Sequence, residues 1–235
     1  MDDGLSRLFL DNIRGAIPFA GAQIEAMMLV VDAALPEVAS FLDLGCGDGI
    51  LGRAILERYP NAQGTFIDFS ETMLNEAKKR YTGQGNAEFI VSDFGRSRWM
   101  EDVKKGAPFN VVVSGYAIHH QPDERKKQLF GEIFGLLSPG GVFVNVEHVS
   151  SSSKWLGSVS DNLFIDSLYD FHKKGGSTKS REEMAHDFFR RPDKDANILA
   201  PVEAQCEWLR SIGFEDVDCY FKVFELAVFG GRRPF

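Results

Sequence analysis

The run from Phe41 to Gly52 constrains the fold more than any other part of the chain. It reads FLDLGCGDGILG, a short apolar strand that contains an acid and is followed by a turn rich in glycine. Glycine lets the backbone turn sharply and lets a ligand come close, because it has no Cβ. A second strand begins at Gly64 and ends at Asp68, whose carboxylate can accept hydrogen bonds from both hydroxyls of a ribose. Together the turn and the second acid predict a site for a nucleoside cofactor.

Two cofactors compete for this turn. Gly47, Gly49 and Gly52 have the G-x-G-x-x-G spacing of a dinucleotide site, which would bind NAD. However, Asp43 stands two residues before Gly45, and a carboxylate there repels an anionic pyrophosphate. An ammonium and a sulfonium, both present in S-adenosylmethionine (SAM), would be attracted instead. The run LDLGCGDG resembles motif I of the class I SAM-dependent methyltransferases.

The resemblance implies a role for each residue along the cofactor. Asp43 would face the methionyl end, Asp68 would hold the ribose, and Asp93 would accept the adenine amino group. Phe69 or Met73 would pack on the adenine face, although Met73 also suits the core. The full expected set of cofactor residues is Asp43, Gly45, Cys46, Gly47, Gly49, Asp68, Phe69, Met73, Asp93, Phe94 and Ser114. The product after methyl transfer would be S-adenosylhomocysteine (SAH).

Strands and helices alternate through the middle of the chain, which is typical of a parallel sheet covered on both faces. The expected strands are 41–44, 64–68, 87–94, 109–116 and 142–149, and the expected helices are 50–59, 70–81, 122–137 and 202–212. The last two strands, 214–221 and 223–229, follow each other too closely to hold a crossover helix, so they must pair antiparallel. We therefore expect an α/β, Rossmann-like, seven-stranded sheet with an antiparallel last strand.

Two segments fall outside this sheet, within what we take as a single domain of 1–235. Residues 1–36 form an expected N-terminal helical cap, with one or two helices over 5–35. Residues 150–200 form an expected lid, with helices over 155–171 and 181–190 and a loop at 173–180 between them. Because ligands bind beyond the carboxyl ends of the strands, an insertion after the fifth strand would cover the site. It could equally be a peripheral addition to the core.

Candidates for a general base follow the fourth and fifth strands. They are Tyr116, His119, His120 and Glu147. His119 and His120 are adjacent and cannot point the same way, and we expect His120 to face the cofactor. Both histidines could instead only shape a loop, since methyl transfer needs a base only when the acceptor loses a proton. A metal held by His120, Glu147 and His148 fits no recognised ligand spacing, so no metal is expected.

The chain also shares features with the bacterial carboxy-SAM synthase branch, whose members convert SAM and prephenate into a tRNA-modifying cofactor. The likeness includes Ile17-Pro18, the SPGG turn at 138–141 and Glu147. Its glycine loop is the ordinary methyltransferase form, and Phe19 stands where that branch has tyrosine. We assign acceptor binding to Arg14, Phe19, Tyr169 and Arg190. An arginine can donate two hydrogen bonds to one carboxylate of an anionic substrate. The acceptor is expected to be a small molecule.

The composition of the chain disfavours some classes of binding partner. The formal net charge of −8 disfavours nucleic acid, whose binding depends on Lys and Arg. No apolar run approaches the length of a membrane span, and the first residues lack the pattern of a signal peptide. Three scattered cysteines form no C-x-x-C pair and indicate reduced thiols in a cytoplasmic protein. A homodimer formed through the N-terminal helices is a further expectation.

Overall fold

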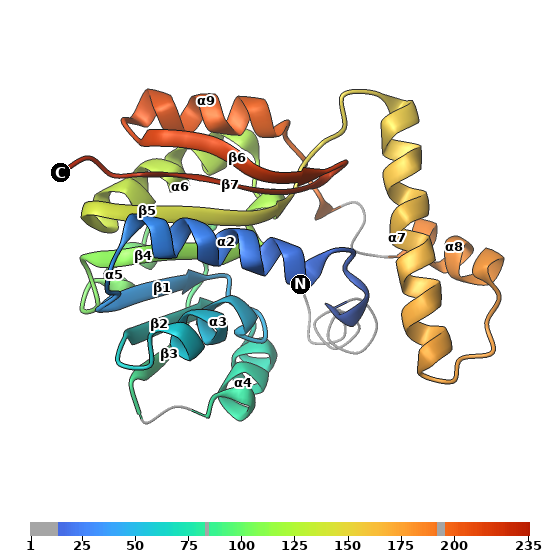
Figure 1. The fold of residues 1–235 in the computed structure, drawn as a ribbon, viewed down its shortest axis with the longest axis horizontal. Helices are drawn as coiled ribbons and strands as arrows, with labels where there is room; N and C mark the ends of the chain where they lie inside the picture. The colour runs from blue at the N-terminus through green and yellow to red at the C-terminus, as the bar shows by residue number, and fades with distance from the viewer. Residues whose placement is uncertain (1–13, 83–84, 192–195) are drawn as a thin grey trace.

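A computed structural model describes residues 14–82, 85–191 and 196–235. Seven strands form one sheet in the order β3-β2-β1-β4-β5-β7-β6 (Figure 1). The first five strands pair parallel, and β7 lies antiparallel to both β5 and β6. The strands are β1 (Ser40–Leu44), β2 (Gln63–Asp68), β3 (Ala87–Val91), β4 (Phe109–Gly115), β5 (Leu137–His148), β6 (Glu215–Val223) and β7 (Leu226–Arg232). The predicted sheet, with its antiparallel last strand, is confirmed.

Helices cover both faces of the sheet. One face packs against α2 (Ala20–Ala34), α3 (Ile50–Arg58) and α4 (Glu71–Arg80), through residues such as Met27, Ile55 and Leu74. The other packs against α5 (Trp99–Val103), α6 (Asp123–Leu136) and α9 (Val202–Ile212). Two short 3-10 turns, η2 (Arg14–Ala16) and η3 (Ile118–His120), lie beside the carboxyl ends of the strands.

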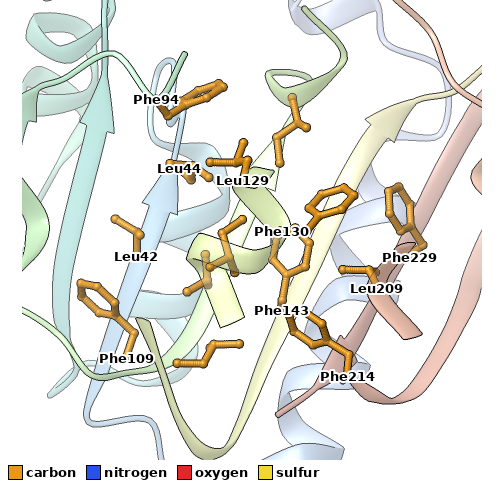
Figure 2. Packing of buried hydrophobic residues seen from close by; sticks show 14 of the residues in the cluster. Leu42, Leu44, Phe94, Phe109, Leu129, Phe130, Phe143, Leu209, Phe214 and Phe229 are labelled. Carbon is orange, nitrogen blue, oxygen red and sulfur yellow. The ribbon is translucent and has the colours of Figure 1, made fainter. Parts of the chain in front are cut away.

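Aromatic side chains fill the core under α6 and α9. Phe143 of β5 lies with its ring centre 5.7 Å from that of Phe130 and 6.2 Å from that of Phe214 (Figure 2). Phe229 of β7 stands edge-on to Phe130 at 6.5 Å. All four residues are buried, and buried aromatic contacts of this kind contribute both area and specific geometry. This core fixes β5 and β7, the two strands whose ends carry polar side chains of the site.

Some element boundaries differ from the sequence expectation. β3 ends at Val91 rather than Phe94, and β5 begins at Leu137, so the SPGG run lies inside a strand rather than in a turn. That run is held in the sheet by the C-terminal tail, because Gly140 N donates to Arg233 O and Arg233 N donates to Gly141 O. The short helix α5 was not predicted. The expected helix before residue 14 lies outside the described residues.

The segment after β5 forms a helical pair, α7 (Lys154–Lys174) and α8 (Arg181–Arg190), which stands beside the sheet rather than on it (Figure 1). We call this pair the lid. Of the 21 residues of α7, only Ser160 and Ile165 are buried. Ser180 begins α8 with a capping box, in which its hydroxyl accepts from Glu183 N and the Glu183 carboxylate accepts from Ser180 N. In the described part of the chain, no helix is long and apolar enough to cross a membrane.

Candidate functional site

The glycine turn after β1 has the backbone conformation that its sequence requires. Gly45, Gly47 and Gly49 all have positive φ, at 67°, 55° and 77°. A Cβ at Gly45 would lie 2.5 Å from the Cβ of Ala117, far inside contact distance. Only glycine therefore fits at the tip of this turn, where the backbone can come close to a ligand.

Two buried carboxylates brace the turn from below. Asp43 accepts a hydrogen bond from Gly52 N at 2.9 Å. Asp68 accepts from Gly47 N at 2.9 Å through one oxygen and from Ser70 N at 2.8 Å through the other. Burial raises the pKa of Asp68 above its ordinary value, although these backbone hydrogen bonds oppose the shift. The site thus pairs a glycine cradle with a preorganised acid, which fits a ribose and a sulfonium-bearing cofactor.

A cavity of about 1120 Å³ opens between this turn and the lid. That volume is large enough for a nucleoside cofactor and a second small molecule together. The sequence-predicted residues that line it are Asp43, Gly45, Cys46, Gly47, Asp68, Phe69, Met73, Asp93, Phe94, Tyr116, His119, His120 and Arg190. Residues from β1, β2 and the segments after β3 and β4 therefore meet at one place, as expected for the carboxyl edge of a parallel sheet.

Other expected residues lie away from the cavity wall. Gly49 caps the N-terminus of α3, and the hydroxyl of Ser114 donates to Leu44 O at 2.7 Å inside the sheet. Phe19 precedes α2 and is 49% exposed, and Tyr169 lies on the lid beneath Lys173, whose ammonium is 5.8 Å from the ring centre. Glu147 lies behind His119. The side chain of Arg14 falls outside the description.

Asp93 and Tyr116 reach the cavity from opposite sides. Asp93 accepts from Gly95 N at 2.9 Å and pairs with Arg96 at 3.2 Å, so its carboxylate is fixed where β3 ends. Tyr116 has a positive φ of 52°, which is unusual for a bulky side chain, and its hydroxyl donates to Gln23 Oε1 at 2.6 Å. Gln23 in turn donates to Pro18 O at 2.8 Å. This chain of bonds ties the segment before α2 to the end of β4.

His119 and Glu147 form a buried pair that is held by two hydrogen bonds. Their Nδ1 and Oε1 atoms are 2.6 Å apart, and the second carboxylate oxygen accepts from His119 N at 3.0 Å. Burial alone would raise the pKa of Glu147, but the charge and hydrogen bonds of His119 outweigh it, so the pKa lies below its ordinary value. Glu147 therefore stays ionised and accepts from Nδ1, so in the neutral form of the ring Nε2 is the proton acceptor.

A second histidine–carboxylate pair, which the sequence did not predict, lies next to the first. His148 Nε2 is 3.1 Å from Glu225 Oε2, and both residues line the cavity. Glu225 sits in the turn between β6 and β7, and the antiparallel pairing of β7 with β5 brings it beside His148. The centres of the His119 and His148 rings are 5.8 Å apart.

His120, the residue that the sequence favoured as a base, has a different environment. Its Nδ1 donates to the carbonyl of Ala196 at 3.1 Å, and its ring lies 4.0 Å from that of His119. It therefore joins the segment that follows the lid to the end of β4. Across the described ranges, no three His, Cys, Asp or Glu side chains gather in a way that could hold a metal ion.

Comparison with known proteins supports the cofactor inferred from this geometry. Residues 41–141 match the model of a methyltransferase domain. A ubiquinone/menaquinone biosynthesis C-methyltransferase of Desulfotalea psychrophila is 26% identical over 86% of this chain and 75% of its own. A carboxy-S-adenosyl-L-methionine synthase of Shewanella halifaxensis is 26% identical over 96% of this chain and 89% of its own.

Solved structures share the fold. An O-methyltransferase family protein of Burkholderia thailandensis has a TM-score of 0.61 at 20% identity, over 96% of this chain and 61% of that one. Human N-acetylserotonin methyltransferase, solved with SAM, has a TM-score of 0.56 at 17% identity. The chain spans 54% of the human protein's length. These findings confirm the predicted cofactor, SAM, and the predicted resemblance to the class I SAM-dependent methyltransferases, whose domain residues 41–141 match.

Proposed function

We propose that this protein transfers the methyl group of SAM to a small-molecule acceptor and that His119, held by Glu147, takes the proton that the acceptor loses. The observation that carries the proposal is that His119, held by Glu147 at 2.6 Å, borders the same cavity as the glycine turn and Asp68. A base and a cofactor site that share one cavity can act on one bound acceptor.

The chain's own residues divide the work of binding the cofactor. Asp68 has a lone pair left on each oxygen after its backbone bonds, and these suit two ribose hydroxyls. Phe69, 39% exposed at the end of β2, offers a ring face to the adenine, while Asp93 and Phe94 border the space beyond it. Asp43 places negative charge under the turn, where the methionyl end would lie.

The chemistry then needs alignment, exclusion of water and one proton acceptor. SAM supplies an electrophilic methyl group on a sulfonium. Holding the acceptor in line with that methyl group can contribute roughly 7–11 kcal/mol of the barrier. As the bond from the acceptor to the methyl carbon forms and the carbon–sulfur bond breaks, His119 Nε2 takes the acceptor's proton, and SAH leaves. The lid residues Phe164, Leu168 and Phe188 provide an apolar wall that keeps water from this end of the cavity.

A direct test combines calorimetry with an acceptor screen. SAM and SAH are expected to bind in the micromolar range while NAD does not bind. Incubation with SAM and a panel of small hydroxyl, amine and acidic-carbon compounds is expected to yield SAH together with a methylated product. SAM binding without any SAH formation across the panel would contradict methyl transfer and favour a non-catalytic SAM-binding protein.

One relative supports a second candidate function. The carboxy-SAM synthase of Shewanella halifaxensis matches nearly the whole chain, and a lid arginine, Arg190, borders the cavity where a carboxylate could bind. On this alternative the protein would modify SAM itself. Mass spectrometry of the nucleoside that co-purifies distinguishes the two: a carboxylated SAM favours the synthase, whereas SAM or SAH favours the methyltransferase.

A further inference from the structure

The two histidine–carboxylate pairs present two ring nitrogens to one cavity. Nδ1 of His119 is held by Glu147, and Nε2 of His148 is held by Glu225. Within the described residues, no protein group bonds to the other nitrogen of either ring, His119 Nε2 or His148 Nδ1. Because both residues line the cavity, these two nitrogens are the ones left for a ligand.

The glutamates also decide which way the protons point. An ionised carboxylate accepts hydrogen bonds only, so each histidine donates its N–H to its own glutamate. The glutamates remain ionised, because the bonds from the histidines hold the pKa of Glu147 and of Glu225 below the ordinary value in spite of burial. In the neutral form of each ring, the remaining nitrogen is therefore a lone-pair acceptor, and it calls for an O–H or N–H donor on the ligand.

The surroundings of the two nitrogens define the rest of the ligand. The lid contributes apolar side chains to the wall of the same cavity. Its members that border the cavity are Phe164, Leu168, Phe171, Met184 and Phe188. Phe188 is buried, and its ring is stacked with that of Phe164 at 6.0 Å between centres, so this part of the wall is aromatic. Such a surface suits a planar apolar body.

We propose that the acceptor is an aromatic compound with two neighbouring hydroxyls, of which one is methylated at His119 and the other is held by His148 Nδ1. The proposal rests on the proposed methyltransferase function and specifies its acceptor class. His119 and His148, with ring centres 5.8 Å apart, can each place one nitrogen against adjacent oxygens of one ring. Glu225 is a positioning residue, because it acts on the ligand only through His148.

Matched probes test the geometry. Catechol has two adjacent hydroxyls, whereas the two hydroxyls of hydroquinone lie on opposite sides of the ring. Phenol has one hydroxyl. Guaiacol has one hydroxyl next to a methoxy oxygen, which cannot donate a hydrogen bond. In assays with SAM, kcat/KM for catechol is expected to exceed that for each of the other three about tenfold or more, since a site nitrogen without its donor loses a hydrogen bond. Equal rates for phenol and catechol, or a preference for hydroquinone, would overturn the proposal.

Variants locate the effect. His148→Asn and Glu225→Gln are expected to raise KM for catechol about tenfold with little change in kcat, and to leave phenol unaffected. Glu225→Asp is expected to restore part of the catechol preference. The control is Glu203→Gln on α9, which removes a surface partner of Lys222 and leaves both histidine–carboxylate pairs intact. A loss of phenol and catechol turnover by the same factor in Glu225→Gln would mean a structural role only.

Different results would contradict the methyltransferase function and the two-hydroxyl acceptor. If no probe yields SAH with the unmodified protein while SAM still binds, methyl transfer to a phenol is wrong. If probes are methylated but His148→Asn leaves the ratio of catechol to phenol unchanged, methyl transfer stands and the two-hydroxyl acceptor is wrong.

Discussion

The two halves of the cavity are built in different ways. On the cofactor side, Asp43 and Asp68 are 1% and 6% exposed, and backbone amides of the glycine turn hold both carboxylates. On the acceptor side, the wall is the lid, whose long helix α7 buries only Ser160 and Ile165. The cofactor side is therefore fixed by the sheet, whereas the acceptor side packs on few fixed groups. Substitutions in the lid can change the acceptor without loss of the cofactor site.

The acceptor side has fixed points of its own, and they come from the sheet. Glu147 at the end of β5 and Glu225 in the β6–β7 turn each orient one histidine. A rigid pair of polar groups thus faces an apolar wall that is less tightly packed. The rate of methyl transfer should depend on the histidines, and the affinity for the acceptor should depend on the lid.

The largest expected effect comes from the fixed part of the acceptor side. His119→Ala should lower kcat about 10²–10⁴-fold, because no other group accepts the proton at that position. The affinity for SAM, measured by calorimetry, should stay the same. His120→Ala is the matched comparison, since His120 is the neighbouring ring and donates to the backbone carbonyl of Ala196. A greater loss for His120→Ala would reverse the assignment of the base.

On the cofactor side, Asp68→Asn should weaken SAM binding by about 1.5–3 kcal/mol, because hydrogen bonds to a charged acceptor are lost. The same variant should also lose the bond that holds Gly47 N or the one that holds Ser70 N. Calorimetric titration measures the change. SAM affinity equal to that of the unmodified protein would remove Asp68 from the cofactor site.

The same residue gives a pH dependence. Since burial raises the pKa of Asp68 above 3.8, the folded protein holds this proton more tightly than the unfolded chain. Without ligand, the contribution of Asp68 to stability therefore falls as pH rises through the window between 3.8 and the raised pKa. SAM affinity should change in the opposite sense and fall on acidification through that window, because the ribose needs the ionised form. Urea unfolding measures the change in stability, and calorimetry measures the change in SAM affinity, both between about pH 4 and pH 7. Asp68→Asn is the control for both measurements.

The contrast between the two halves also explains what the sequence could predict. The cofactor side depends on local spacing: Asp43, the glycines and Asp68 follow one another along the chain at strand ends, so their convergence follows from a parallel sheet. Glu225 could not be found in this way, because it reaches His148 only through the register of β7 on β5. The choice between His119 and His120 likewise depended on the carboxylate behind one of them. The start of β5 was missed because the C-terminal tail, far away in sequence, holds Gly140 and Gly141 in place.

A packing change should show how rigid the cofactor side is. A Cβ at Gly52 would lie 2.2 Å from the ring of Phe66, which stacks on Phe89 at 4.9 Å and meets Phe41 edge-on at 5.5 Å. The ring cannot move aside without disturbing the core, so Gly52→Ala should destabilise the protein by about 1–3 kcal/mol in urea unfolding. Gly131→Ala in α6, where nothing lies within 4 Å, should instead stabilise it slightly. Equal stability of the two variants would mean that Phe66 is free to repack.

The smallest effect compares one substitution in both halves. Ser180 caps α8 in the lid, and Ser70 caps α4 beside the cofactor, where its hydroxyl accepts from Met73 N at 3.3 Å. Ser180→Ala should speed amide hydrogen exchange several-fold within residues 181–190 and leave the global Tm unchanged, because the lid packs little on the sheet. Ser70→Ala should lower the Tm, because α4 packs on the sheet and the substitution removes the hydroxyl that caps it. If Ser180→Ala lowered the Tm as much as Ser70→Ala, the lid would unfold together with the sheet, and the acceptor side would be as rigid as the cofactor side.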